Sequence, residues 1–311
     1  MDAAQAVNVA VTATPVGRSL VEKLSRNWAV LLGGGVLFLL AMLSLAAPWL
    51  GTIDPTLLDP INRDRLPGAS GEVFSLTGEA LQHTFWMGTD SYGRDIYSRV
   101  LYGGRVSLVV GIAVALLSLG FGLTIGLVAG YIRALDGVIM RVMDGFMAIP
   151  GILLAIALVS LWRASLATVI LAITIPEIPR VVRLVRSLVL SIREEPYVEA
   201  AVSVGTPTAA LLVRHILPNT MAPLIVQATY VFAFAILVES ILSFLGVGLP
   251  TDLPTWGNIM AEGRLQFTQY PHNVFFPGVF LSLTVLAVNM LGDGLRDTLD
   301  PKFNQRGDRP A

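Results

Sequence analysis

Two acidic residues, Asp144 and Glu239, lie in or beside long apolar runs of this 311-residue chain. A carboxylate in hydrocarbon is costly, so we expect each one to face a polar cavity, a partner group or an interface. Two interpretations stay open for both residues. They line a solute pathway or gate, or they make a hydrogen bond between helices or sit at the level of the lipid headgroups.

No sequence motif of catalysis or metal binding accompanies these carboxylates. The chain has no GxxxxGK[ST] phosphate loop and no HExxH motif, and its three histidines are scattered at positions 83, 215 and 272. It has no cysteine, which excludes disulfides and thiolate metal sites. The net charge of −1 gives no basic field for nucleic acid. We therefore expect a chain that is not an enzyme, holds no metal and binds no cofactor itself.

The composition indicates a membrane protein. Charged residues make up 14% of the chain, against about a quarter in soluble domains, and the mean hydropathy is +0.70. A membrane-spanning helix needs roughly 20 apolar residues. Six spans are predicted, at residues 28–50, 106–130, 145–161, 165–176, 220–238 and 273–292. The fourth is short and precedes Glu177 and Arg180, but omitting it would force a loop across the bilayer.

Basic residues predict the orientation of these spans. With both termini in the cytoplasm, most of the 21 Lys and Arg residues fall in cytoplasmic segments, as the positive-inside rule requires. The first run is longer than the apolar part of a signal peptide, so we expect an uncleaved span. The predicted organisation is a cytoplasmic segment 1–27, span 28–50, an external loop 51–105, a five-span core 106–293 and a cytoplasmic tail 294–311.

Two sets of residues recur at helical spacing. The glycines of the second span lie four apart, at Gly122, Gly126 and Gly130. We expect them to allow close helix packing, with a lining of the transport path as the alternative. Three arginines follow the fourth span at intervals of three, at positions 180, 183 and 186. They orient the helix by reaching toward the headgroups, or they contact a cytoplasmic partner.

The stretch 194–219 has helix start and stop residues that are typical of an ordered cytoplasmic loop. Pro196 suits the first turn of a short helix, and Gly205 suits a left-handed stop. Thr206 and Pro207 suit the start of a second helix, which we expect to end before Pro218. The pattern predicts two short helices joined at a bend. Docking of a soluble partner and a merely well-folded loop both remain open on this pattern.

The same stretch resembles the EAA loop of bacterial ABC importer permeases. The resemblance rests on Glu199-Ala200-Ala201, on Gly205 four residues later and on the ending His215-Ile216-Leu217-Pro218-Asn219. In that family the loop supplies a coupling helix that docks in a groove of the ATPase subunit. The resemblance therefore implies coupling roles for Tyr197, Glu199, Ala200, Ala201, Gly205, His215 and Pro218.

Further blocks resemble the dipeptide/oligopeptide/nickel group of these permeases, in particular the "C" type subunit of dipeptide and glutathione importers. Before the second span these blocks are Gly88-Thr89-Asp90 and Gly93-Arg94-Asp95. This outer-loop motif forms a structural turn, or it contacts the binding protein or the solute. The sequence departs from many relatives after Gly248, where a Gln-Pro-Pro run is missing.

The resemblance implies an all-α membrane protein with six transmembrane helices and the type I importer permease architecture, in a bacterial inner membrane. It implies a second permease subunit, two ATP-binding subunits that use ATP and Mg, and an extracytoplasmic solute-binding protein. Peptides or glutathione are the expected solutes, with nickel chelates, opines and short glycans as alternatives. A stand-alone secondary transporter is a competing class that would show internal repeats with broken helices.

Overall fold

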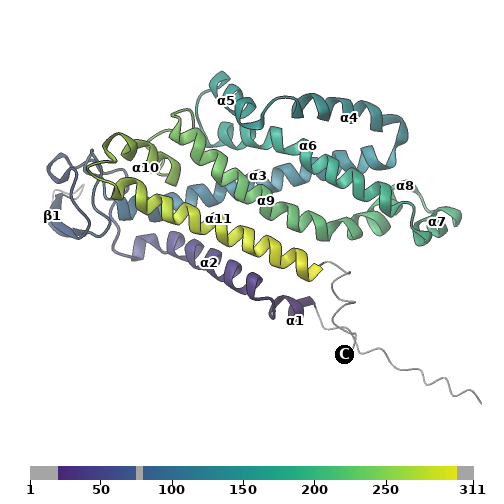
Figure 1. The fold of residues 1–311 in the computed structure, drawn as a ribbon, viewed down its shortest axis with the longest axis horizontal. Coiled ribbons are helices and arrows are strands. Elements are labelled where there is room, and N and C mark those ends of the chain that lie inside the picture. Colours follow the sequence, from purple (N-terminus) through teal and green to yellow (C-terminus); the bar gives the residue numbers. More distant parts are fainter. Residues whose placement is uncertain (1–19, 75–79, 300–311) are drawn as a thin grey trace, which may run out of the picture.

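The protein is a bundle of long helices with a small cap at one end (Figure 1). The computed structural model describes residues 20–74 and 80–299, so the predicted segments before residue 20 and after residue 299 lie outside it. The elements are α1 Leu20–Leu24, α2 Trp28–Leu45, η1 Ala47–Trp49, η2 Pro60–Asn62, β1 Ala69–Phe74, β2 Ala80–Phe85, α3 Ile96–Tyr131, α4 Arg133–Met147, α5 Gly151–Leu161, α6 Leu166–Ile192, α7 Pro196–Ser203, α8 Thr208–Leu211, η3 Leu212–Ile216, α9 Leu217–Phe244, α10 Trp256–Gly263, η4 Arg264–Gln266 and α11 His272–Leu299.

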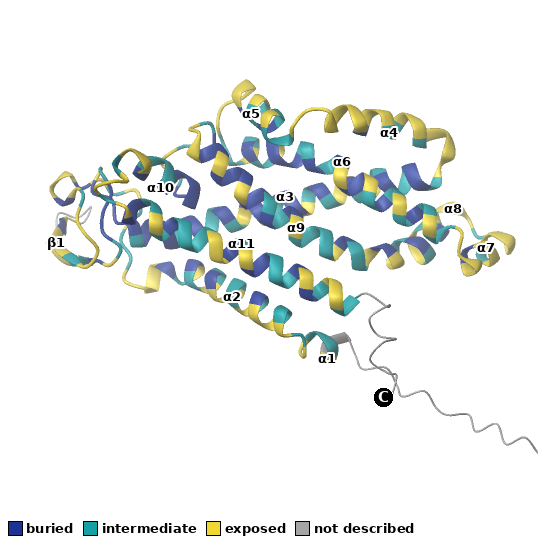
Figure 2. Ribbon diagram, viewed as in Figure 1, coloured by how far each residue is buried: buried dark blue, intermediate teal, exposed yellow. Residues whose placement is uncertain are grey.

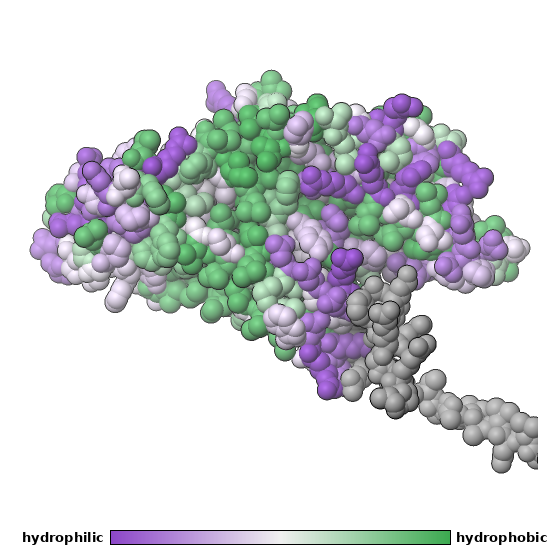
Figure 3. Space-filling view, viewed as in Figure 1, coloured by the Kyte–Doolittle hydropathy of each residue, from purple (hydrophilic) through white to green (hydrophobic). Residues whose placement is uncertain are grey.

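The two ends of the bundle differ in what they carry. We call them the α7 end, which also holds α1 and the end of α11, and the hairpin end, which holds β1, β2 and α10 (Figure 1). Buried residues concentrate in α3, α6 and α9, whereas α4 and α7 are largely exposed (Figure 2). Apolar side chains gather over the middle of the bundle, and polar ones gather toward the two ends (Figure 3). This distribution is that of a bundle set in a bilayer.

Among the described residues, four helices are long and apolar enough to cross a membrane, and the bent pair α4 and α5 adds a fifth. The four are α2, the continuous helix α3, the helical run from Thr208 to Phe244, and α11. The bent pair replaces the predicted span 145–161, which is wrong as one straight helix. Pro150 disfavours a helical conformation at the residue before it, and the two helices meet at 83°.

Two other predicted spans lie inside helices that are longer than the spans. The predicted span 106–130 lies within α3, which begins at Ile96, so the last residues of the predicted external loop are helical. The predicted span 165–176 forms the first part of the 27-residue helix α6, which continues through Pro176 and Pro179. In both places charged residues suggested a loop, but the folded chain supplies partners for them. Arg105, for example, donates to the carbonyl oxygens of Ser44 and Leu45.

Glycine allows a close helix contact between α3 and α6. A Cβ added at Gly122, Gly126 or Gly130 would lie within about 2.4–2.6 Å of a valine Cβ on α6. The valines are Val181, Val185 and Val189, and all three are fully buried. The predicted role of the glycines in close packing is confirmed, and the contact lies inside this chain. Backbones that approach this closely gain van der Waals contact without any polar group.

The cap at the hairpin end is built by the segment between α2 and α3. β1 and β2 pair antiparallel, with Ala69 opposite Phe85 and Phe74 opposite Ala80. Val73 and Phe85 are buried. This hairpin was not predicted, because its strands are short and one of its faces is polar. The cap rests on the first turns of α3 and on α10, which together close this end of the bundle.

Candidate functional site

The loop at the α7 end is an ordered bend. Gly205 has φ +83°, the left-handed conformation predicted for it. Its N–H donates to the carbonyl of Val202 at 2.9 Å, and the N–H of Thr206 donates to the carbonyl of Ala201 at 3.1 Å. These two bonds form a Schellman motif, which satisfies the last carbonyls of α7. The direction in which the chain leaves α7 is therefore set by the backbone conformation at Gly205.

The side chains of this bend divide into an anchor and an exposed face. Val198 is buried and fixes α7 to the bundle. Glu199 and Ala200 are exposed, and Ala201 is half-buried. Val204 is 87% exposed at the tip. The exposed face also includes Tyr197, Val202 and Gly205. An apolar tip beside a carboxylate is a suitable surface for a protein partner.

The second half of the loop differs from the prediction. Helix α8 begins at Thr208, with Pro207 rather than Thr206 at the N-cap. Pro218 does not end the helix, because the chain passes through the π-helical turn η3 directly into α9. A proline lacks an N–H and clashes with the carbonyl four residues earlier, and a wider π turn relieves both problems. The bend at Gly205 is thus joined to α9 by continuous helix.

A side-chain bond ties α7 to the base of α9. The Asn219 amide donates to the Tyr197 hydroxyl at 3.0 Å and to the carbonyl of His215 at 2.7 Å. Of the predicted coupling residues, Tyr197, His215 and Pro218 therefore lie together at this base. Glu199, Ala200 and Gly205 lie on the exposed bend. The predicted coupling residues therefore form two groups, one on the exposed bend and one at the base of α9.

Asp144 and Glu239, the two candidate gate residues, lie apart. The Asp144 carboxylate is half-exposed and pairs with Arg183 at 2.6 Å. Glu239 is fully buried in α9, where it accepts a hydrogen bond from the Ser243 hydroxyl at 2.8 Å. The fold does not bring the two carboxylates into one site. Each carboxylate has a side-chain partner within the chain, and a role of either residue in a solute pathway or gate stays a prediction.

The three arginines of α6 all have acidic partners within the chain. Arg180 pairs with Glu177 in the same helix, and Arg183 and Arg186 pair with residues of α4. Arg186 holds Asp136 through two hydrogen bonds. Helix α4 is therefore fixed along the α7 half of α6 by two ion pairs. Sequence spacing gave no indication of these partners, which lie 39 and 50 residues away.

The outer-loop motif is a buried structural turn. Gly88 and Gly93 have φ of +81° and +78°. A Cβ at Gly93 would lie 1.7 Å from the carbonyl oxygen of Asp59, so no other residue fits there. Thr89 is fully buried and accepts from the N–H of Arg65 at 2.8 Å. Asp95 is fully buried and caps α3 by accepting from the N–H of Ser98.

A four-residue ion-pair network continues from this turn. Arg94 and Arg99 each contact the carboxylates of both Asp90 and Glu262, at distances of 2.5–2.7 Å. Arg99 is 1% exposed. The network joins the turn to the start of α3 and to α10, so it locks the cap on the bundle. Glu262 could not be predicted from the sequence, because it lies 163 residues from Arg99 and no local pattern marks it.

Metal chemistry finds no support in this arrangement. Within residues 20–74 and 80–299, no group of three His, Cys, Asp or Glu side chains is placed to hold a metal ion. The candidate surfaces are instead a protruding bend at one end and a rigid cap at the other.

The sequence is similar to a known family of transport proteins. Residues 122–305 match the family model described as "Binding-protein-dependent transport system inner membrane component". The chain is 50% identical over 288 residues to a probable peptide ABC transporter permease protein, y4tQ, of Sinorhizobium fredii, covering 93% of this chain and 94% of the relative. It is 40% identical to the dipeptide transport system permease protein DppC of Alkalihalophilus pseudofirmus, covering 94% and 92%.

A solved structure shows the same fold. The chain superimposes on a chain of the inward-facing MetNI methionine ABC transporter with a TM-score of 0.53 and 19% identity, covering 65% of this chain and 96% of that one. At this identity the likeness concerns the fold alone.

Proposed function

Because the chain belongs to the family of inner-membrane components of binding-protein-dependent transport systems, we propose that it forms half of the translocation pathway of an ABC importer for peptides or related small solutes. It is a multi-pass protein of the bacterial inner membrane and a transport subunit, not an enzyme. Peptides are proposed because two relatives carry peptide or dipeptide transport in their names. Nickel chelates, opines and short glycans are the alternative solutes.

The observation that carries the proposal is the exposed bend around Gly205 and its rigid connection to α9. A soluble ATPase must grip a protruding, ordered element in order to move a membrane helix. Val204 offers an exposed apolar tip, and no flexible residue interrupts the helix between α8 and α9. Movement of the tip is therefore passed to α9 as a shift of packed helices between two arrangements.

We further propose six membrane crossings with both termini in the cytoplasm. The crossings are α2, α3, the bent pair α4 and α5, α6, α9 and α11, which alternate in direction along the bundle (Figure 1). Six crossings return the chain to its starting side, which supports a common side for the α7 bend and both described chain ends. The basic residues of the α7 end support the cytoplasm as that side.

The proposed partners are those that the family implies, and the topology assigns each one to an end of the bundle. A second permease subunit completes the pathway, and two ATP-binding subunits use ATP and Mg at the α7 end. An extracytoplasmic solute-binding protein docks at the hairpin end, where the locked cap offers a stable platform. In this scheme the chain itself binds no nucleotide.

Cross-linking in the assembled transporter tests the proposal. The chain has no native cysteine, so Val204→Cys carries the sole attachment point for a short photoreactive maleimide. We expect Val204→Cys to cross-link to an ATP-binding subunit. Leu265→Cys, 86% exposed near α10, is the matched control and is expected to give no such product. The reconstituted complex should take up dipeptide only with ATP. Uptake without the ATP-binding subunits would overturn the proposal.

A further inference from the structure

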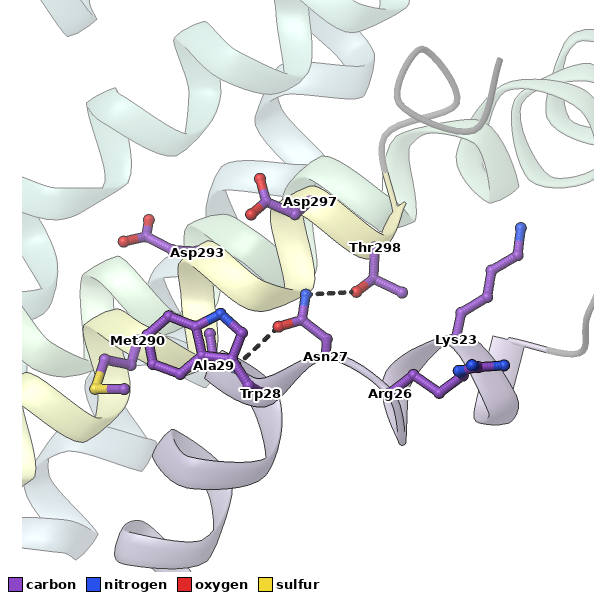
Figure 4. Close-up of a pocket in the computed structure, with 9 residues that line it drawn as sticks. All are labelled: Lys23, Arg26, Asn27, Trp28, Ala29, Met290, Asp293, Asp297 and Thr298. Carbon is purple, nitrogen blue, oxygen red and sulfur yellow. Dashed lines mark hydrogen bonds between the residues drawn. The ribbon is translucent and has the colours of Figure 1, made fainter. Parts of the chain in front are cut away.

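A cavity of about 520 Å3 lies at the α7 end between α1, the start of α2 and the last turns of α11 (Figure 4). Its base is fixed by Asn27. The Asn27 amide donates to the carbonyl of Gly294 at 3.0 Å and to the hydroxyl of Thr298 at 3.2 Å. The same side chain caps α2 by accepting from the N–H of Ala29 at 3.0 Å. These bonds join the start of α2 to the last turns of α11.

The walls carry charges of both signs. Lys23 and Arg26 lie on the α1 side, and Asp293 and Asp297 lie on α11 (Figure 4). Neither basic residue forms an ion pair with another residue in the described part of the chain. Asp293 accepts a hydrogen bond from the Tyr230 hydroxyl at 2.9 Å and keeps its second oxygen available. Two cations and two carboxylates around one cavity match a ligand that is itself zwitterionic.

The cavity lies at the level of the lipid headgroups. Trp28, which lines it, is 67% exposed and is the first residue of the apolar helix α2. Tryptophan at the end of an apolar span, with basic residues just beyond it, is typical of the membrane–water boundary. This position holds for either orientation of the chain. The ligand most concentrated at that level is a phospholipid headgroup.

We propose that this cavity binds the headgroup of a phospholipid with a primary ammonium group, phosphatidylethanolamine. Lys23 and Arg26 contact the phosphate, since basic residues between helices at this level hold lipid phosphates. Asp293 and Asp297 accept hydrogen bonds from the ammonium group, which has three N–H donors. The acyl chains lie along α2 beside Trp28. Phosphatidylglycerol lacks the cation, and phosphatidylcholine lacks N–H donors. Neither can therefore donate hydrogen bonds from an ammonium group to Asp293 and Asp297.

Native mass spectrometry of the assembled transporter, with each lipid titrated separately, tests this site. We expect one additional phosphatidylethanolamine to be retained about tenfold more tightly than phosphatidylcholine or phosphatidylglycerol. The double variant Lys23→Gln/Arg26→Gln should lose this retention by about tenfold. The matched control is Arg133→Gln/Arg141→Gln, which removes two exposed charges from α4 and leaves the cavity unchanged. It should retain the lipid as the wild type does.

A second variant keeps the test independent of the folding of α1. Asp297→Asn changes an exposed side chain and should abolish the preference for phosphatidylethanolamine over phosphatidylglycerol. Equal retention of all three lipids by the wild type would overturn the proposal, as would unchanged retention in both cavity variants. Soluble phosphoethanolamine is the competing source of the same chemistry. Its displacement of the lipid at equal concentration would assign the cavity to a soluble solute and overturn the lipid site.

Discussion

At Gly205, backbone conformation alone decides which residues are tolerated. A Cβ added there would meet no atom within 4 Å, so any effect of a side chain comes from φ +83° and not from a clash. A β-branched residue is strained in this region by about 1–3 kcal/mol. We predict that Gly205→Val redirects the chain after α7 and uncouples ATP hydrolysis from uptake. Peptide uptake and ATPase activity of the reconstituted complex, measured together, give the ratio that tests this.

Asparagine supplies the matched control at the same position, because it tolerates the left-handed conformation better than valine does. Gly205→Asn should keep most of the coupling that Gly205→Val loses. If both variants transport normally at normal expression, the bend is not the element that transmits force.

Arg99 allows a comparison between a buried ion pair and an exposed one. It is 1% exposed and contacts two carboxylates, so Arg99→Gln leaves Asp90 and Glu262 short of positive charge inside the protein. Losing one partner of a buried pair costs about 3–5 kcal/mol. The pair of Arg183 with Asp144 is half-exposed, so Arg183→Gln should cost under about 1 kcal/mol. Thermal unfolding in detergent should show a clearly larger loss of Tm for Arg99→Gln.

Residues whose role is local were the ones that sequence alone predicted well. The left-handed glycine at 205 follows from its place between two short helical patterns. Glu262 had no such signal, since its importance comes from arginines more than 160 positions away. The partners of Asp144 and Glu239 had no local signal either. Hydropathy shows that Asp144 and Glu239 are unusual, but only the fold shows what each one faces.

Between whole elements, the packing of α3 on α6 sets the tolerance for small side chains. A Cβ at Gly126 would lie 2.6 Å from the Cβ of Val185, so Gly126→Ala should push the two helices apart. Overpacking of this kind costs about 1–3 kcal/mol. Gly120→Ala on the same helix is the control, because nothing lies within 4 Å of its added Cβ. Equal Tm values for the two variants would contradict the close contact.

Apolar length predicted where helices run, but not where they begin and end. The start of α3 was missed because the uncharged run begins only after Arg105, although the carbonyl oxygens of Ser44 and Leu45 accept hydrogen bonds from that arginine. Helix α6 was cut short at Pro176 because proline and charge both argue against a span. Pro218 was assigned as a helix end, since a π turn leaves no mark in the sequence. Each error arose where a tertiary contact or a backbone adjustment supplied what local sequence lacks.

At the scale of the whole molecule, the two ends of the bundle are built for different tasks. The hairpin end is locked by buried ion pairs, and the α7 end carries an exposed bend on a continuous helix. The rigid cap suits the proposed docking of a solute-binding protein. The α7 bend, joined to α9 by helix, suits the proposed contact with an ATP-binding subunit. This division requires the two ends to lie on opposite sides of the bilayer.

Single cysteines in the cysteine-free chain test that requirement directly. Ser203→Cys lies on the exposed bend, and Leu265→Cys lies near α10 at the other end. We predict that a membrane-impermeant maleimide added to spheroplasts labels Leu265→Cys at once and Ser203→Cys only after the membrane is opened. Both side chains are exposed in this chain, and labelling of Ser203→Cys after the membrane is opened shows that it is accessible in the transporter, so a difference before opening reports the side of the membrane. Labelling of Ser203→Cys in intact spheroplasts would place the bend outside the cell, where no ATPase can reach it.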